Sequence, residues 1–324
     1  MFPIRHLLNF AAGAACLSVV PIGDTHANDT LAVMGAGGLQ FERTDELRMV
    51  REDLFLSPGE VRVAYVFRNL TDHEVRATAV FPMPDIDVGL MSETPHEFHR
   101  SAHDGDIFDF HAEVDGTAIA PTFEARAFHG ADDVTALLIE HHVPLVNTQL
   151  DYPSADAIRA LTAAGLIAAA DDLHHPRWIV KPAYHWVQVF PGRRDIRVAH
   201  RYKPVLGGGR WGGKMDAHPR DELSGSYCPD EAFTTAFNKL PSDDLQVRWL
   251  EYRLLNGADW AGPIGHFRLE LDKANANLVS LCPIPGLNLT KRGRTFVAEA
   301  NEYTPTKDIR VLFVYSLCSN QSRD

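Results

Sequence analysis

The segment Val61–Pro84, VRVAYVFRNLTDHEVRATAVFPMP, constrains the fold more than any other part of the chain. Apolar residues alternate with other residues on both sides of the polar loop 69–73. Alternation with a period of two around such a loop is typical of an antiparallel β-hairpin with one buried face. Pro82 and Pro84 cannot donate hydrogen bonds to a central ladder, so we expect the second strand to stop there or to follow a sheet edge.

Strand-like patterns recur through the rest of the chain. Leu47 and Met49 lie in one phase and Leu54 and Leu56 in the other, which suggests a bulge or two short strands. Asp115-Gly116 predicts a tight hairpin between 108–114 and 119–128. We expect further strands at 184–190, 196–202, 247–255, 267–271, 278–281, 295–300 and 309–316. Many short strands separated by turn residues predict a mainly β chain with an antiparallel β-sandwich architecture.

Two segments favour helices instead. Ser154 can cap a helix, or a pair of short helices broken at Gly165, within 154–172. Pro229 suits the first helical position of 229–240. We therefore expect two β domains with a small helical insertion. The expected order is a signal peptide at 1–27, an N-terminal β-sandwich domain at 28–130, a partly helical insertion at 131–177 and a C-terminal mostly β domain at 178–324.

The first 27 residues predict export. A basic start at 5–6 precedes the apolar stretch 7–22, and Thr25-His26-Ala27 offers a small-x-small cleavage site. The apolar stretch ends too early for a transmembrane helix. Cys16 raises a lipoprotein alternative, but Gly13 stands where a lipobox has Leu. We expect a periplasmic or secreted protein, cleaved near Ala27, with no transmembrane segment in the mature chain.

Charge and motifs exclude several functions. The chain has 31 basic and 43 acidic residues, a net charge of -12, which disfavours nonspecific binding to nucleic acid or anionic membranes. The glycine-rich stretch 207–214 lacks the hydroxyl residue of a phosphate loop, because Met215 follows Lys214. Neither a Gly-x-Ser-x-Gly elbow nor a His-Glu-x-x-His zinc helix is present in the sequence. We therefore expect no cofactor and no nucleic-acid partner, and we favour a non-enzymatic role.

Two histidine- and aromatic-rich patterns are candidate sites. His96, His99 and His103 lie in one stretch with several carboxylates, and such side chains bind zinc, copper or nickel. The alternative is a solvated polar loop, since Gly105 disfavours the helix on which these spacings would converge. The second candidate is a ligand groove or a packing cluster on two adjacent strands, formed by Tyr184, Trp186, His200 and Tyr202.

The cysteines leave a further choice open. Cys228, Cys282 and Cys318 follow the expected signal peptide, and in an oxidising compartment one pair should form a disulfide. Cys228 also precedes a predicted helix, where a thiol has a lowered pKa and can act as a nucleophile. The residues before it match no cysteine-hydrolase signature.

Several passages together resemble a known family. They are NDTLAVMGAGGLQF at 28–41, the 61–84 segment with its FRN and FPMP ends, YHWVQVFPGRRDIRVAHRYKP at 184–204, SYC at 226–228 and GADWAGPIGHFRLELDKANANLVSLC at 257–282. They are similar to an uncharacterised bacterial family of secreted proteins, domain of unknown function 4424. The resemblance implies no activity. Residues 47–122 also resemble the vault/inter-alpha-trypsin type domain, an all-β interaction module, which favours a sandwich.

The resemblance also bears on the cysteines. Cys228 and Cys282 both lie in passages that carry it, so we expect them to form the disulfide and Cys318 to remain free. Our preferred interpretation is an exported, non-enzymatic β-sandwich protein that binds an envelope component or a ligand. The alternatives are a metal-binding or metal-dependent hydrolytic protein that uses His96, His99 and His103, and a thiol-active protein that uses Cys228.

Cleavage after Ala27 makes Asn28 the first residue of the exported protein. Intact-mass measurement on protein recovered from outside the cytoplasm should give the mass of residues 28–324 with no lipid. A mass that retains Cys16 together with acyl chains would contradict the expected cleavage.

Overall fold

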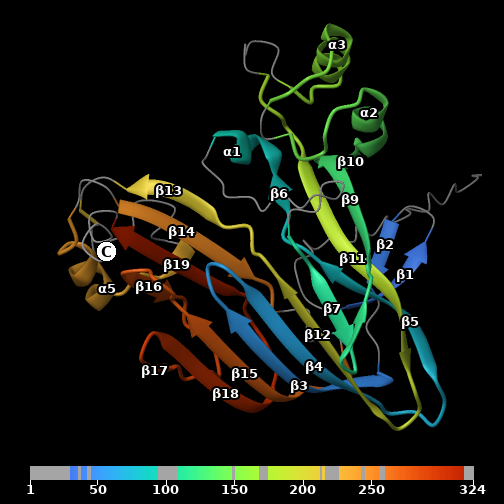
Figure 1. The fold of residues 1–324 in the computed structure, drawn as a ribbon, viewed down its shortest axis with the longest axis vertical. Coiled ribbons are helices and arrows are strands. Elements are labelled where there is room, and N and C mark those ends of the chain that lie inside the picture. Colours follow the sequence, from blue (N-terminus) through green and yellow to red (C-terminus); the bar gives the residue numbers. More distant parts are fainter. Residues whose placement is uncertain are drawn as a thin grey trace, which may run out of the picture.

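Three β-sheets contain most of the residues that the computed structural model describes, which are 30–35, 38–41, 45–93, 108–147, 150–167, 174–211, 214–215, 226–241, 245–254 and 260–316. The fold is mainly β, as the sequence predicts, and only short helices occur in these ranges (Figure 1). Among the described strands, every pair is antiparallel except β3 with β15, which is parallel. No helix in the described ranges is long and apolar enough to cross a membrane.

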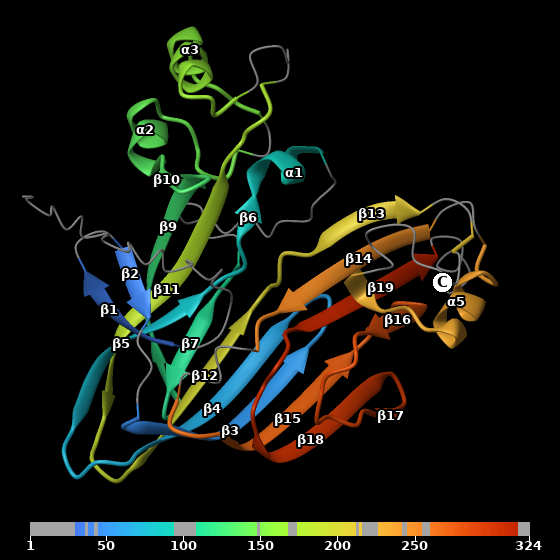
Figure 2. The same cartoon turned by 180° about the vertical axis from the view of Figure 1, so that it is seen from behind.

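Sheet B has eight strands and supplies the surface on which the other two sheets pack (Figures 1 and 2). Its strand order is β17 (Thr290–Arg292), β18 (Thr295–Tyr303), β15 (Ile264–Asp272), β3 (Leu47–Leu56), β4 (Val61–Asn69), β12 (Asp195–Tyr202), β7 (His111–Val114) and β8 (Thr117–Ile119). The predicted tight turn joins β7 to β8, and both Asp115 and Gly116 have positive φ there, at 49° and 78°. This is the conformation that a two-residue hairpin loop requires.

Sheets A and C are smaller. Sheet A has the order β10 (Asp132–Asp133), β9 (Thr122–His129), β11 (Ile179–Phe190), β5 (Val75–Pro82), β1 (Thr30–Gly35) and β2 (Gly38–Phe41), and β6 (Ile86–Asp87) pairs with β11 beside this path. Sheet C has the order β13 (Gly207–Trp211), β14 (Leu245–Tyr252), β19 (Ile309–Ser316) and β16 (Leu278–Leu281).

Helices lie at the ends of the sheets. Beyond one end of sheet A are α1 (Val88–Glu93), α2 (Thr135–Glu140) and α3 (Ala155–Ala163), and α5 (Glu231–Phe237) contacts β16 of sheet C (Figure 1). Ser154 caps α3 as predicted, and the helix stops before Gly165, the predicted breaking point, because this glycine takes a positive φ of 74°. In α5 the cap is Asp230, which accepts a hydrogen bond from the Phe233 backbone, so Pro229 lies before the helix rather than at its first position.

The predicted hairpin at 61–84 is wrong in its pairing although both strands exist. β4 pairs with β3 and β12 in sheet B, whereas β5 pairs with β11 and β1 in sheet A. The intervening loop therefore carries the chain from one sheet to the other. A period of two defines which face of a strand is buried, but it does not define the neighbouring strand. β5 does end at Pro82, as the sequence predicts.

A second connection crosses between the same sheets directly beside the first, from β11 to β12 (Figure 1). The two loops are bound together, since Asn69 donates its backbone N–H to the Arg194 carbonyl and Arg193 donates its backbone N–H to the Thr71 carbonyl. They approach so closely that a Cβ at Gly192 would lie 2.4 Å from the Asp72 carbonyl oxygen. Only glycine fits there without displacing backbone.

The buried Asn69 side chain holds this corner. Its amide nitrogen donates to the His73 and Phe190 carbonyls, each at 2.8 Å, and its oxygen accepts from the Thr71 backbone and hydroxyl. Asn69 is fully buried, so these bonds replace the water that its amide would otherwise require.

The expected domain boundaries do not follow the sheets. In sheet A, β11 pairs with β5 and β9, and in sheet B, β12 pairs with β4 and β7 while β15 pairs with β3. Strands from 28–130 and from 178–324 are therefore interleaved. One cluster of buried side chains joins all three sheets, and its members include the Tyr65 and Tyr252 hydroxyls, 3.4 Å apart.

The predicted bulge in β3 lies at Val50, where the register shifts between Met49 and Arg51. Its carbonyl points at β15, and a Cβ at Gly265 would lie 2.6 Å from it. The bulge brings Glu52 onto the inner face, where it is fully buried and both carboxyl oxygens lack a hydrogen-bond partner in the described chain. Burial raises the pKa of Glu52 to about 8, and the nearby Asp53 charge adds to the effect.

Glu52 predicts a pH dependence of stability. The folded chain holds the proton up to about pH 8, whereas the unfolded chain releases it near its ordinary pKa of 4.5. Between these values the folded state binds more protons, so the free energy of unfolding falls as pH rises, by up to about 1.4 kcal/mol per pH unit from this group.

Urea denaturation of wild type and Glu52→Gln between pH 5 and pH 8 tests this expectation. The variant should lose most of the slope and be more stable than wild type at pH 8. Glu299→Gln neutralises an exposed carboxyl on the same sheet and is the control. Equal slopes in wild type and Glu52→Gln would contradict the prediction.

Candidate ligand groove on sheet B

The four residues predicted to line a groove do come together, but inside the sandwich. Tyr184 and Trp186 project from β11 in sheet A, while His200 and Tyr202 project from β12 in sheet B. The Trp186 and His200 rings are 5.4 Å apart, and Phe81 lies edge-on to both His200 and Tyr202. This arrangement is the aromatic packing that joins the two sheets.

Burial sets the protonation of this cluster. His200 is 3% exposed, and burial lowers its pKa to about 3, so the imidazole is neutral at physiological pH. Burial raises the pKa of Tyr202, which keeps its phenol protonated. The cluster is therefore uncharged, and two of its members border the cavities described next, His200 in one and Tyr184 in the other.

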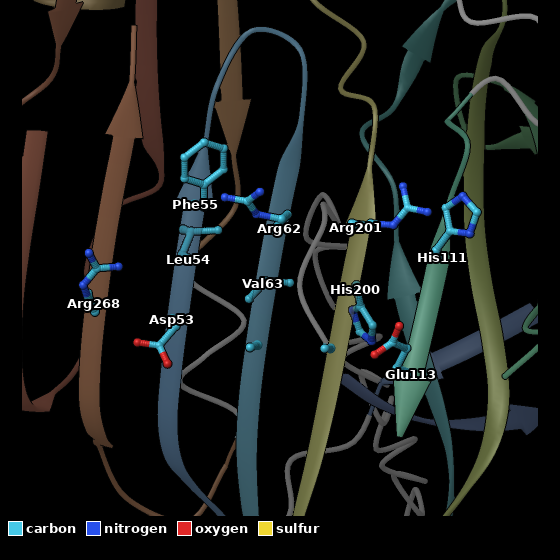
Figure 3. A pocket seen from close by; sticks show the side chains of 12 residues that line it. Asp53, Leu54, Phe55, Arg62, Val63, His111, Glu113, His200, Arg201 and Arg268 are labelled. Atoms are coloured by element: carbon cyan, nitrogen blue, oxygen red, sulfur yellow. The ribbon is translucent and has the colours of Figure 1, made fainter. Parts of the chain in front are cut away.

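An open groove lies on the opposite face of β12, away from this aromatic cluster. A groove of about 330 Å³ crosses the outer face of sheet B between β15 and β7 (Figure 3). The groove is open at its centre because the small side chains of Ala64 on β4 and Ala199 on β12 lie next to each other in register. It is lined by Asp53, Leu54, Phe55, Arg62, Val63, Ala64, His111, Glu113, Ala199, His200, Arg201 and Arg268.

Two arginines and a histidine form one row across the groove. Arg201 pairs in register with Arg62 of β4 and with His111 of β7, and the three side chains lie at a similar level on neighbouring strands (Figure 3). Arg62 bonds to Glu60 at 3.0 Å and covers the Phe55 ring at 4.0 Å. Within the described part of the chain, Arg201 makes no ion pair.

A neighbouring carboxylate orients the His111 imidazole. Its Nε2 lies 3.1 Å from the Asp109 carboxylate, whose other oxygen is 3.3 Å from the Lys203 ammonium. Partial burial raises the pKa of Asp109, but the hydrogen bonds from Lys203 and His111 outweigh it and the net shift is downward. Asp109 therefore remains ionised and orients the imidazole toward the groove.

A carboxylate lies on each side of the alanine floor. Glu113 pairs in register with Ala199, and Asp53 pairs with Ala64. Asp53 is already bound by Arg51, with oxygen and nitrogen 2.5 Å apart, whereas Glu113 is exposed. The groove thus has two parallel rows of side chains. The row with the two guanidinium groups lies two residues along the strands from the row with the two carboxylates.

A second cavity of about 490 Å³ adjoins the groove at the β7–β8 hairpin. The two share His111, Glu113 and Arg201 as a common wall. The remaining lining is mostly apolar and comprises Phe110, Ala112, Ala118, Ile119, Ala120, Pro121, Phe123 and Tyr184.

The predicted metal ligands His96, His99 and His103 lie outside the described residues. In the described ranges, no group of three or more His, Cys, Asp or Glu side chains is placed to hold a metal ion. The metal-binding alternative therefore remains a sequence-based expectation.

The predicted disulfide is present between Cys228 and Cys282, and Cys318 lies outside the described residues. The bridge consumes the thiol of Cys228, so the thiol-active alternative is wrong in this state of the protein. The Ser280 hydroxyl donates to the Tyr227 carbonyl close by, which ties the segment before α5 to β16 a second time.

Sequence reasoning missed the residues that define the groove. Arg62, Ala64, Ala199 and Arg201 occupy the outward positions of two strands whose inward positions are apolar or aromatic. An outward arginine on a strand is normally a solvated side chain, so it gives little signal alone. The combination of Ala-x-Arg with Arg-x-Ala on strands that pair was the available clue, but it required knowledge of the pairing.

The fold and this groove define a class, namely a β-sandwich protein with an open groove on one sheet that is lined by charged side chains. The chain belongs to the family described as Domain of unknown function (DUF4424), whose model matches residues 27–312. No curated protein matches the sequence.

Three solved structures illustrate a distant similarity. A "putative nutrient binding protein" from Legionella pneumophila subsp. pneumophila str. Philadelphia 1 is 14% identical with a TM-score of 0.43, over 90% of this chain and 71% of that one. Yeast LTA4 hydrolase in complex with bestatin is 7% identical with a TM-score of 0.32, over 83% of this chain and 28% of that one. An M1 zinc metallopeptidase from Deinococcus radiodurans is 8% identical with a TM-score of 0.29, over 84% of this chain and 43% of that one. The chain spans less than half the length of these two enzymes.

The disulfide predicts a large contribution to stability. The bridged residues are 54 apart, and closing a loop of that size in the unfolded chain is worth about 4 kcal/mol in the chain-entropy model. The Cys228→Ser, Cys282→Ser double variant should therefore unfold at a clearly lower urea concentration than wild type. If wild type and the double variant have the same midpoint, the bridge does not stabilise the fold.

Proposed function

We propose that this chain is an exported, non-enzymatic binding protein and that its ligand binds in the groove on the outer face of sheet B. The observation that carries the proposal is Arg201, an exposed guanidinium that makes no ion pair within the described chain and stands beside Arg62 in a groove. A guanidinium is always charged and its planar fork binds carboxylates and phosphates through two hydrogen bonds. The ligand therefore presents an anionic group to this pair.

The groove favours binding over catalysis. Of the described residues that line it, none is a serine, threonine, cysteine or lysine that could act as a nucleophile. His111 pairs with Asp109, but the described lining of the groove contains no serine, threonine, cysteine or lysine that His111 could activate. A shallow floor of two alanines also leaves the bound group accessible to water, which suits reversible recognition.

Export supports the same assignment. The N-terminal 27 residues have the pattern of a signal peptide, and the disulfide between Cys228 and Cys282 is typical of proteins that fold outside the cytoplasm. An exported binding protein meets small molecules and envelope components directly.

An NMR titration of the purified protein with sodium acetate tests the groove. Acetate should shift the backbone amide signals of Arg62 and Arg201, with an affinity in the millimolar range for so small a probe. Removing a charged hydrogen-bond partner costs about 1.5–3 kcal/mol, so Arg201→Ala should weaken acetate binding at least tenfold.

Arg197→Ala is the matched control, because Arg197 projects from the same outer face of β12 four residues away and does not line the groove. This variant should bind acetate like wild type. Equal loss in both variants would indicate a general charge effect, and no saturable shift near Arg201 in wild type would refute the proposed site.

A further inference from the structure

The second cavity gives information about the part of the ligand that is not charged. It opens between the β7–β8 hairpin and sheet A, and its wall includes the Phe110 and Tyr184 rings, stacked with centroids 4.1 Å apart. The Phe123 ring also packs against Tyr184, with the ring centroids 5.1 Å apart. Phe110, Ile119 and Phe123 are each only partly buried, so an apolar occupant would remove further apolar surface from water.

The position of Arg201 connects this cavity to the groove. Arg201, His111 and Glu113 line both, so a ligand whose charged group contacts Arg201 can extend its remaining atoms into the apolar cavity. The cavity volume of about 490 Å³ lies in the range typical of small-molecule pockets, roughly 300–1,000 Å³, and is far below what a folded partner needs.

The charge on the shared wall limits the ligand further. Glu113 is exposed, borders both cavities and makes no ion pair in the described part of the chain. A carboxylate here repels a second negative charge on a ligand that is already bound to Arg201. The wall therefore favours a group with one negative charge, such as a carboxylate, over a phosphate dianion.

We infer that the ligand is a small amphiphilic organic acid, with its carboxylate on Arg62 and Arg201 and its apolar chain or ring in the cavity lined by Phe110, Ile119 and Phe123. This inference rests on the proposed function, since it assigns the ligand class of the same groove. It adds the apolar half of the site, which the groove alone does not contain.

A series of straight-chain acids provides the test. Acetate, butanoate, hexanoate and octanoate share one head group and differ only in apolar length. Each buried methylene should tighten binding by up to about fourfold, so octanoate should bind far more tightly than acetate until the cavity is full. Hexan-1-ol, which lacks the charge, should bind more weakly than hexanoate, and Arg201→Ala should remove that difference.

Variants of the cavity separate its contribution from that of the groove. Phe123→Ala should weaken octanoate binding far more than acetate binding, which flattens the increase in affinity along the series. Phe128→Ala is the matched control, since Phe128 is a partly buried phenylalanine on the same strand β9 outside the cavity lining. Ile119→Ser on the edge strand β8 is a second cavity variant in a place that tolerates substitution, and it should act in the same direction as Phe123→Ala.

Three results would overturn the inference while leaving the groove itself in place. The first is acetate binding at Arg201 with no gain along the series. The second is a gain that Phe123→Ala and Ile119→Ser both leave intact. The third is tighter binding of inorganic phosphate than of octanoate at pH 8. If no acid in the series, acetate included, binds through Arg201, the proposed function fails together with the inference.

Glu113 gives an independent readout. Glu113→Gln should tighten the binding of inorganic phosphate at pH 8 several-fold and change octanoate binding less. Vesicles of phosphatidylglycerol distinguish a free acid from a membrane lipid, because the protein should not float with them. Flotation that Arg201→Ala abolishes would assign the site to lipid and refute the free acid.

Discussion

The hydrogen bonds of the Asn69 side chain fix the corner on which the sandwich depends. Two chain segments, β4 to β5 and β11 to β12, pass there from one sheet to the other, and the amide of Asn69 satisfies carbonyls from both. Because the amide is buried, replacing it with an apolar side chain would leave these carbonyls without partners, at about 1–3 kcal/mol each. The corner thereby sets how sheet A lies on sheet B, and this placement creates the aromatic interface around Phe81 and His200.

The interface and the groove are opposite faces of the same strands. Along β12 the chain alternates Ala199, His200 and Arg201, so the inward imidazole packs on Phe81 while its two neighbours face the groove. On β4, Val63 and Tyr65 face inward on either side of the outward Ala64. A change in the aromatic interior will therefore shift the backbone that positions Arg62 and Arg201. Stability and ligand binding are coupled through a single layer of backbone.

The sequence predicts those features that depend on local pattern. The Asp115-Gly116 turn, the bulge in β3 and the boundaries of β4 and β5 follow from turn chemistry and alternation alone. The partners of those strands do not, because alternation is the same whether a strand pairs with its sequence neighbour or with one a hundred residues away.

The candidate site could not be predicted from the sequence, because it also depends on which strands pair. Arg62 and Arg201 are more than a hundred positions apart in the sequence, and only the β4–β12 register places them side by side. The burial of Glu52, by contrast, could have been predicted from the alternation of apolar residues along β3. Once the bulge shifts the phase of β3, this acidic residue falls on the apolar face with Leu54 and Leu56. The disulfide could be predicted because the two cysteines stand in passages of the family resemblance.

The parallel pairing of β3 with β15 has a consequence for how the chain reaches this structure. Its strands are separated by more than two hundred residues, so the middle of sheet B forms through a contact of very high sequence separation. Non-local pairings of this kind slow folding, since the entropy of closing the loop is lost before the contact is gained. During synthesis from the N-terminus, β3 and β4 exist for some time with one edge of β3 unoccupied. An unoccupied strand edge attracts strands of other chains, so the nascent protein requires protection from aggregation until residue 272 has been added.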